Sequence, residues 1–244
     1  MNERGSRVLI VDDDADIRAN FSDILSDLGY QTTTAEDGVA ALRCIRESRF
    51  DVVLLDYQMP GMDGASLYRE IKKLQPSIAA IMITAWAGSD GAQQAKNAGT
   101  WDVLRKPVDI PDLLEKLSRA ATAPIVLVVD DDEEFCQSLW QILNLKHFRV
   151  ALAHSEAEGI SRAADSKYQV AIVDLKLGSG DGRKVIRRIH RAIPEARTII
   201  VSGDQKTAAD AYEELGDQIV NAVCAKPIDV EQLLTMIESE TGRN

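Results

Sequence analysis

Two kinds of residue are scarce in this sequence, cysteine and the aromatic residues. The 244 residues include three cysteines, and phenylalanine, tryptophan and tyrosine together make up 5% of the chain. Cys44, Cys136 and Cys224 are far apart and form no Cys-x-x-Cys pair, which argues against a disulfide framework and against the common zinc-site patterns. We interpret them as buried apolar side chains of a protein in a reducing compartment.

Long apolar runs are absent as well. The longest one, Ala123–Val129, contains Pro124 and is far shorter than the roughly 20 apolar residues of a transmembrane helix. The first residues, MNERGS, are not followed by the apolar segment of a secretory signal peptide. We therefore expect a cytoplasmic protein that does not associate with a membrane.

The chain also lacks an excess of positive charge. It has 28 lysine and arginine residues against 39 aspartate and glutamate residues, which gives a net charge of −11. A surface that binds the phosphates of nucleic acids needs clustered lysine and arginine. The composition therefore argues against a nucleic-acid partner, whereas 45% hydrophobic and 27% charged residues are ordinary for a globular protein.

What the sequence does contain is an internal repeat. The segment VLIVDDDADIR at 8–18 matches VLVVDDDEEFC at 126–136, a shift of 118 residues. The same shift pairs VVLLDYQMPGMDG at 52–64 with VAIVDLKLGSGDG at 170–182, so each copy has an aspartate after an apolar run and an Asp-Gly pair further on. A period of this length is the size of a domain. We predict two homologous domains, at 1–121 and 125–244, joined by a short linker at 122–124.

Each half alternates short apolar runs with helical patterns. In the first half Val8–Val11, Val52–Leu55 and Ile81–Ile83 are apolar throughout, as in strands that are covered on both faces. Between the first two, from Ile17 to Leu28, apolar side chains recur at the three- and four-residue spacing of a helix. The second half repeats the pattern from Ile125 onward. Alternating strands and helices predict an α/β fold with a doubly wound parallel sheet in each half.

Polar residues stand at the carboxyl ends of these strands, which is where doubly wound sheets bind their ligands. Because parallel strands end at the same edge of a sheet, we expect the side chains of each half to converge there. The two sets are Asp12, Asp13, Asp56, Thr84 and Lys106 in the first half, and Asp130, Asp131, Asp174, Ser202 and Lys226 in the second.

Such a set of side chains predicts a chemistry. Three carboxylates that converge repel one another unless a cation lies between them, and an all-oxygen set favours a hard divalent ion, Mg²⁺ or Mn²⁺, in each half. The metal ion, the lysine and the hydroxyl group can together stabilise a phosphoryl group, and a carboxylate at a strand end can accept it. The sequence therefore predicts phosphoryl transfer to an aspartate.

In these residues both halves resemble the receiver domains of two-component response regulators, and the resemblance covers essentially the whole chain. It implies two flavodoxin-like (βα)5 domains, each with a parallel sheet in the strand order 2-1-3-4-5. It also implies a role for each site residue. The phosphoacceptors are Asp56 and Asp174, the metal-binding acidic pairs are Asp12 with Asp13 and Asp130 with Asp131, and the phosphoryl-binding side chains are Thr84, Lys106, Ser202 and Lys226.

Further features follow from the resemblance alone. It implies that the backbone carbonyls of Gln58 and Lys176 complete the metal ligands and that the peptide bonds before Pro107 and Pro227 are cis. It implies a histidine kinase or phosphotransfer protein as phosphoryl donor. The face formed by helix 4, strand 5 and helix 5 would then contact a downstream protein, or a second copy in a homodimer. Such a domain catalyses its own phosphorylation and dephosphorylation but is not otherwise an enzyme.

One departure from the family pattern concerns the residue three before the strand-5 lysine. This residue is aromatic in many receivers and couples to the hydroxyl residue, but Val103 and Val223 stand there in this chain. Trp86, two residues after Thr84, is a candidate for the missing switch residue or for a partner contact.

The second departure is in the loop after the second acceptor. The residues after Asp174 lack the Met-Pro-Gly that follows Asp56, and Lys176 places a cation two residues from the acceptor. We expect the second domain to hold its phosphoryl group for a different time than the first.

Several alternatives stay open. The aspartates could be helix caps of a duplicated fold, a role we expect for Asp14 and Asp132. The second domain could act mainly as a structural or dimerisation module. Because the chain ends at Asn244, soon after the last expected helix, we expect output through protein contact, but a regulatory fragment of a cyclase or kinase would look the same. Haloacid-dehalogenase-like phosphatases also use an aspartate nucleophile, but they have Asp-x-Asp after strand 1 instead of adjacent aspartates.

Overall fold

The computed structural model describes the chain except for residues 1–4, 86–93, 96–97, 165–167 and 243–244. The chain divides into two compact units, Met1–Ala123 (unit 1) and Pro124–Asn244 (unit 2). This boundary falls within the segment expected as a linker, and the last helix of unit 1 extends into that segment as far as Thr122.

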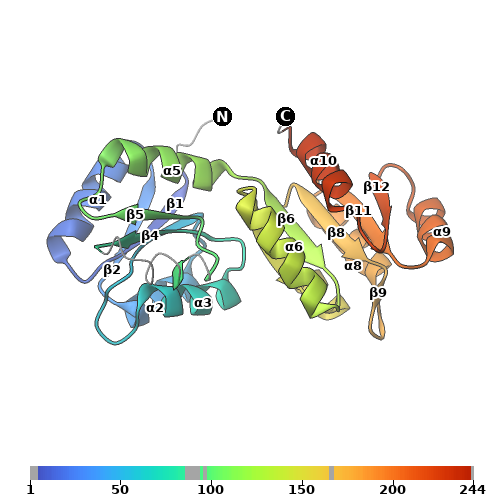
Figure 1. The fold of residues 1–244 in the computed structure, drawn as a ribbon, viewed down its shortest axis with the longest axis horizontal. Helices are drawn as coiled ribbons and strands as arrows, with labels where there is room; N and C mark the ends of the chain where they lie inside the picture. The colour runs from blue at the N-terminus through green and yellow to red at the C-terminus, as the bar shows by residue number, and fades with distance from the viewer. Residues whose placement is uncertain (1–4, 86–93, 96–97, 165–167, 243–244) are drawn as a thin grey trace. The chain divides into compact units, whose positions relative to one another are not determined.

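Unit 1 is built on a parallel sheet of five strands in the order β2-β1-β3-β4-β5 (Figure 1). Strands β3 and β4 are buried along their whole length, because they lie inside the sheet with helices on both faces. The edge strand β2 has the polar sequence QTTTA and is partly exposed. The strands are β1 (Arg7–Val11), β2 (Gln31–Ala35), β3 (Val52–Asp56), β4 (Ala79–Thr84) and β5 (Asp102–Arg105).

Helices cover both faces of this sheet (Figure 1). On one face, α1 (Ala15–Asp27) and α5 (Ile110–Thr122) pack side chains such as Leu25 and Leu117 onto the strands. On the other face, α2 (Gly38–Glu47) and α3 (Gly64–Leu74) do the same with Ile45 and Ile71. The two apolar layers hold the strands parallel and bring their carboxyl ends to one edge.

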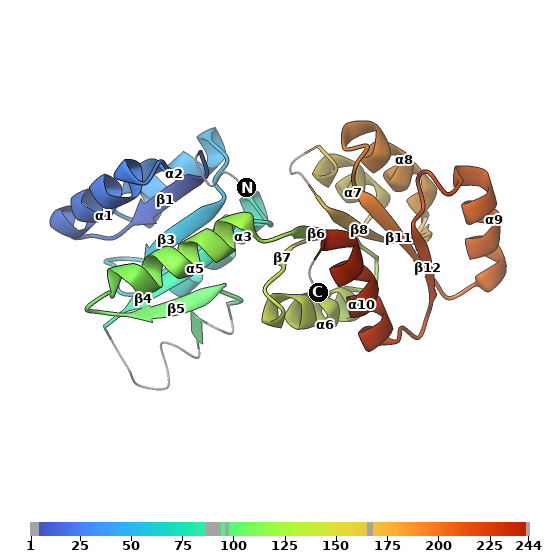
Figure 2. The same cartoon turned by 90° about the horizontal axis from the view of Figure 1, so that it is seen from above.

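Unit 2 repeats this architecture, with its sheet in the order β7-β6-β8-β11-β12. Helices α6 and α10 lie on one face of the sheet, and α7, α8 and α9 lie on the other (Figure 2). The strands of the sheet are β6 (Ile125–Val129), β7 (Arg149–Ala153), β8 (Val170–Asp174), β11 (Arg197–Ser202) and β12 (Ala222–Ala225). The helices are α6 (Glu133–Leu145), α7 (Glu156–Arg162), α8 (Gly182–Ala192), α9 (Gln205–Leu215) and α10 (Val230–Thr241).

One element of unit 2 was not predicted. The loop after β8 forms a two-stranded antiparallel hairpin of β9 (Lys176–Leu177) and β10 (Gly180–Asp181). Gly178 lies at its turn with a φ of 62°, a backbone conformation that glycine adopts without a steric cost. The matching loop of unit 1, residues 58–63, contains no strand.

The structure confirms the predicted fold class, two doubly wound parallel sheets in the order 2-1-3-4-5. It also confirms the two expected helix caps, since the Asp14 side chain accepts hydrogen bonds at the start of α1 and Asp132 does so at the start of α6. Among the described residues, no helix is both long enough and apolar enough to cross a membrane.

Candidate functional site

The acidic pair of unit 1 lies in a tight turn between β1 and α1. Asp12 follows the last residue of β1, and its Oδ1 atom accepts a hydrogen bond from the backbone N–H of Asp14 at 2.9 Å. Asp14 in turn accepts from the backbone N–H groups of Asp16 and Ile17. This turn leaves Asp12 buried and Asp13 exposed, so that only the second carboxylate of the pair faces solvent.

Asp56 is the last residue of β3 and is buried. A close backbone approach fixes this position, because a Cβ atom built on Gly64 would lie 2.4 Å from the carbonyl oxygen of Asp56. The N–H of Gly64 also donates to the carbonyl of Tyr57 at 2.9 Å, and Asp63 caps α3. The Asp-Gly pair of the repeat therefore serves to bring the start of α3 against the end of β3.

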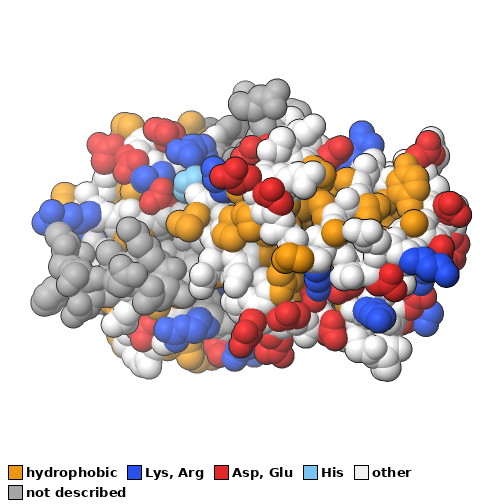
Figure 3. Space-filling view, turned by 45° about the vertical axis from the view of Figure 1, so that its right-hand side comes forward, with side chains coloured by type: hydrophobic (Ala, Val, Ile, Leu, Met, Phe, Trp, Pro, Cys, Tyr) orange, Lys and Arg blue, Asp and Glu red, His pale blue; other side chains and the backbone are white. Residues whose placement is uncertain are grey.

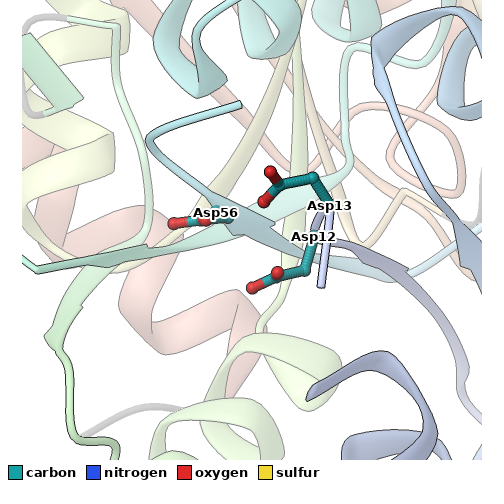
Figure 4. Close-up of side chains that lie close together, drawn as sticks. All are labelled: Asp12, Asp13 and Asp56. Atoms are coloured by element: carbon teal, nitrogen blue, oxygen red, sulfur yellow. The ribbon is translucent and has the colours of Figure 1, made fainter. Parts of the chain in front are cut away.

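The three carboxylates meet at this edge of the sheet. One carboxylate oxygen each from Asp12, Asp13 and Asp56 lie within 4.8 Å of one another, and Figure 4 shows the first two extending from the end of β1 beside the third at the end of β3. Lys106 joins the cluster, because its Nζ atom donates to Asp12 Oδ2 at 3.1 Å and to Asp56 Oδ2 at 3.0 Å.

The register of the sheet brings the remaining two groups to the same edge. Asp56 pairs with Ile83, so Thr84 lies one residue beyond the position of Asp56 on the neighbouring strand. Thr84 is buried, and its carbonyl accepts the backbone N–H of Lys106 at 2.8 Å. The peptide bond between Lys106 and Pro107 is cis.

Unit 2 brings together the matching residues. One oxygen each from Asp130, Asp131 and Asp174 again lie within 4.8 Å of one another. Lys226 Nζ donates to Asp130 Oδ2 and to Asp174 Oδ2, both at 2.7 Å. The peptide bond between Lys226 and Pro227 is cis.

The hydroxyl residue of unit 2 is held by its own loop. Val201 pairs with Asp174, so Ser202 lies one residue beyond the position of Asp174 on the neighbouring strand. The Ser202 hydroxyl donates to the carbonyl of Asp204 and accepts from its N–H, both at 3.2 Å, and the Ser202 carbonyl accepts the backbone N–H of Lys226 at 2.9 Å.

Burial and the neighbouring lysine shift the pKa values of the buried carboxyl groups in opposite directions. Burial raises the pKa of Asp56, with a further contribution from Asp12, and the hydrogen bond from Lys106 only partly offsets this. Burial also raises the pKa of Asp130 against the opposing effect of Lys226. Burial would lower the pKa of Lys106, but its hydrogen bonds to Asp56 and Asp12 outweigh burial and raise it. Each lysine thus stays protonated between its two carboxylates.

The donor set suits a hard divalent cation. It consists only of carboxylate oxygens, with two buried groups and one exposed group in each unit, and such ions prefer oxygen ligands. One lysine charge cannot neutralise three converging carboxylates, so a divalent ion would remove the remaining repulsion.

The two residues expected to supply a backbone carbonyl to the metal ion are Gln58 and Lys176, each two positions after an aspartate of the cluster. Lys176 is exposed, and its backbone N–H donates to Asp174 Oδ1 at 3.0 Å.

The residues expected at the switch position differ in exposure. Val223 on β12 has 40% of its surface exposed, whereas Val103 on β5 is half-buried and packs against the apolar core beside α2 and α3. Trp86 lies outside the described residues.

In unit 2 a cavity of about 550 Å³ lies between α9 and β12, lined by Ser202, Tyr212 and Val223 among others.

Sequence reasoning did not identify two side chains that support the acidic pairs. In unit 1, Arg18 Nη1 donates to the backbone carbonyl of Asp12 at 2.7 Å. In unit 2, at the matching position, Cys136 Sγ donates to the carbonyl of Asp130 at 3.4 Å. Because unlike side chains bind the same backbone atom, the repeat carried no signal for this role.

Comparisons with known proteins agree with the geometry. Residues 8–118 and 126–238 each match the response regulator receiver domain. The chain is 33% identical over 232 residues to a response regulator receiver protein of Anaeromyxobacter sp. (strain Fw109-5), a match that covers 95% of this chain and 94% of that protein. The chain therefore belongs to the response regulator receiver family of two-component signalling and carries two receiver domains in tandem.

Single-domain relatives match one unit. Sporulation initiation phosphotransferase F of Bacillus subtilis (strain 168) is 35% identical over 119 residues, which cover 49% of this chain and 94% of that protein. The crystal structure of a CheY-like receiver domain protein from Methanospirillum hungatei JF-1 is 34% identical, with a TM-score of 0.46, and covers 48% of this chain and 93% of that chain.

Proposed function

We propose that both units accept a phosphoryl group, on Asp56 in unit 1 and on Asp174 in unit 2. A carboxylate oxygen of the acceptor forms a bond to phosphorus, the bond from phosphorus to the donor breaks, and the donor leaves with its electron pair. Charge then builds up on the phosphoryl oxygens, and Lys106 or Lys226, already beside the acceptor, is in place to stabilise it.

The observation that carries this proposal is the lysine that bridges two buried aspartates in each unit. Lys106 joins Asp12 to Asp56, and Lys226 joins Asp130 to Asp174, all through side-chain hydrogen bonds of 2.7 to 3.1 Å. Two buried carboxylates placed side by side are costly for a fold to build without a use, even when they share one partly exposed lysine. Its presence in both units, although the surrounding residues differ, supports one chemistry for both.

The carboxylates of each unit would hold one Mg²⁺ or Mn²⁺ ion. In unit 1 the ligands would be Asp12, Asp13, Asp56 and the carbonyl of Gln58, and in unit 2 Asp130, Asp131, Asp174 and the carbonyl of Lys176. When bound, the ion would neutralise part of the negative charge of the incoming phosphoryl group. Thr84 and Ser202 would donate a hydroxyl hydrogen bond to a phosphoryl oxygen.

A histidine kinase or a phosphotransfer protein would supply the phosphoryl group, and the phosphorylated chain would act by contacting a downstream protein or a second copy of itself. In unit 2 the face that corresponds to the expected output surface is formed by α9, β12 and α10, on which Tyr212, Val223 and Val230 are exposed. Exposed apolar side chains also appear between charged ones on the face shown in Figure 3. Such surfaces favour a protein partner.

Intact-mass measurement tests the acceptors. The full chain is incubated with Mg²⁺ and acetyl phosphate, and we expect two phosphoryl adducts that are labile in base. Asp56→Asn and Asp174→Asn should each remove one adduct, and the double variant should remove both. Asp63→Asn is the matched control, because Asp63 caps α3 in the acceptor loop and should leave both adducts in place.

The result also separates the two units. Adducts that persist in the double variant would overturn the assignment of the acceptors. Labelling of Asp56 alone would leave unit 2 with a structural or dimerisation role. Turnover of small phosphate esters without a stable adduct would instead indicate a phosphatase.

A further inference from the structure

We propose that Phe135 positions Lys226 and thereby speeds phosphoryl transfer to Asp174, an inference that rests on the function proposed above. Lys226 Nζ lies 5.0 Å from the centroid of the Phe135 ring. A cation at this distance is attracted by the negative face of an aromatic ring. Phe135 is partly buried and packs against the apolar core between the sheet and helices α6 and α10, so the ring is held in place from behind.

The fold determines where this ring points. Asp132 caps α6, and its Oδ1 atom accepts the backbone N–H of Phe135 at 2.9 Å. This bond fixes Phe135 in the first turn of the helix, directly after the turn that carries the acidic pair. Lys226 follows β12 and reaches the same turn through Asp130. The ring and the two carboxylates therefore contact the same ammonium group.

Unit 1 offers the matched comparison, because Ile17 stands at the position of Phe135. Isoleucine has no π-system, and a cavity of about 480 Å³ lies beside Lys106, lined by Ile17, Phe21 and Pro107 among others. The bonds from Lys106 to its two carboxylates are 3.1 and 3.0 Å, against 2.7 Å for both bonds of Lys226. The two lysine side chains are almost equally exposed, at 27% and 26%, so solvent exposure does not account for the difference in these distances.

This contact affects the reaction through the position of the ammonium group. When Asp174 attacks acetyl phosphate, an Asp174 oxygen–phosphorus bond forms, the phosphorus–oxygen bond to the acetyl group breaks, and acetate leaves with the electron pair. Negative charge then has to be stabilised on the phosphoryl oxygens beside Lys226. A lysine held by an aromatic ring loses less freedom on reaching that arrangement than a lysine beside an aliphatic side chain.

The experiment measures the rate of phosphorylation of each unit in the full chain with acetyl phosphate and Mg²⁺. In an Asp56→Asn background only Asp174 can be labelled. Phe135→Leu should slow this labelling by about two- to fivefold, the range of an exposed cation–π contact, whereas Phe135→Tyr, which keeps the ring, should restore the rate. Thermal melting of each variant controls for stability.

Two further variants show whether Phe135 acts through the lysine. When Lys226→Met is present, Phe135→Leu should cause no additional loss, because the cation is gone. In an Asp174→Asn background, Ile17→Phe should speed labelling of Asp56, since the cavity beside Lys106 has room for a ring.

The outcomes separate this inference from the function on which it rests. If Asp174 of the otherwise unchanged chain takes up no phosphoryl group, the proposed function fails for unit 2, and the role of Phe135 fails with it. If Asp174 is labelled, two results would overturn the positioning role while the proposed function stands. One is an unchanged rate of labelling in Phe135→Leu. The other is that Phe135→Leu slows labelling by the same factor whether or not Lys226→Met is present.

Discussion

The two units share one set of charged contacts but differ in what surrounds it. Lys106 and Lys226 each bridge two buried aspartates. The backbone carbonyl of the first aspartate of each acidic pair accepts a hydrogen bond from a different side chain, Arg18 in unit 1 and Cys136 in unit 2. A backbone carbonyl accepts a hydrogen bond from many side chains, whereas an ammonium group between two carboxylates has few substitutes. The two units accordingly differ at the first position and agree at the second.

The loops after the two acceptors differ more strongly. In unit 2 this loop is the β9–β10 hairpin. Glu156 at the start of α7 accepts from the N–H of Asp181 in β10 at 2.8 Å, and from Lys184 Nζ in the following helix α8 at 3.1 Å. In unit 1 the loop has no ladder, and Met59 and Met62 pack it against the core. Methionine side chains adapt their shape easily, so we expect the loop of unit 2 to be the more restrained one.

The largest effect that would sharpen this comparison is expected from the lysines. Lys106→Ala should slow phosphorylation of Asp56 by about ten- to a hundredfold, because a charge-assisted hydrogen bond to the reacting group is lost. Lys226→Ala should do the same to Asp174. Peptide mapping after labelling with acetyl phosphate assigns the loss to a unit. If either variant slowed both acceptors, the sites would not be independent.

A metal-ligand variant should have the next largest effect. Asp13→Asn should raise the Mg²⁺ concentration for half-maximal labelling of Asp56 by about tenfold or more, because it removes an exposed carboxylate from the cluster. Labelling of Asp174 should keep its Mg²⁺ dependence, and Asp131→Asn should show the reverse pattern. An unchanged Mg²⁺ dependence in both units would argue that the acidic pairs do not bind the ion.

The glycines after the acceptors test the backbone that the units share. In Gly64→Ala the added Cβ would lie 2.4 Å from the carbonyl oxygen of Asp56, and in Gly182→Ala 2.0 Å from that of Asp174. Each should lower the free energy of unfolding by about 1–3 kcal/mol, because backbone atoms must move apart. Gly38→Ala, whose Cβ has ordinary contacts of 3.5 Å or more, is the control in calorimetric unfolding. Equal melting curves for Gly64→Ala and Gly38→Ala would refute this account.

The smallest expected effect concerns the pH dependence of stability, which tests one buried carboxyl group in each unit. Burial raises the folded-state pKa of Asp56 above its ordinary value of 3.8. The folded state therefore binds the proton more tightly than the unfolded state, and this stabilisation is present below pH 3.8 and lost as pH rises through the folded pKa. Asp56→Asn cannot ionise, so its stability relative to the original chain should increase as pH rises above about 4.

In unit 2 burial raises the pKa of Asp130, and Asp130→Asn should show the same trend. Thermal unfolding from pH 3.5 to 7 in the presence of a chelator measures both. Mg²⁺ should reduce the advantage of each asparagine variant, because the ion stabilises the ionised carboxylates. A stability difference that stayed constant with pH would show that burial does not oppose ionisation of these groups.

Much of the candidate site could be read from local patterns. The apolar runs that became β3 and β4 needed no tertiary information, because strands buried on both faces are apolar at every position. The order of the polar residues at the strand ends, repeated at a shift of 118 residues for the aspartates and 120 for the lysine, was sufficient to predict that Asp12, Asp56 and Lys106 converge. The edge strand β2, with its sequence QTTTA, showed no such run, since it is half exposed and paired along one edge.

The amino-acid sequence by itself determined which groups reach the carboxyl edge of each sheet, because parallel strands impose this whatever the packing. Only the tertiary structure decided what stands beside them. The contact of Phe135 with Lys226 joins α6 to the loop after β12, 91 positions later in the chain. The hydrogen bond from the N–H of Asp181 in β10 to Glu156 in α7 also depends on how neighbouring elements pack. Such contacts join residues without a common local pattern, so they follow from the packing of helices on the sheet and not from periodicity or motif.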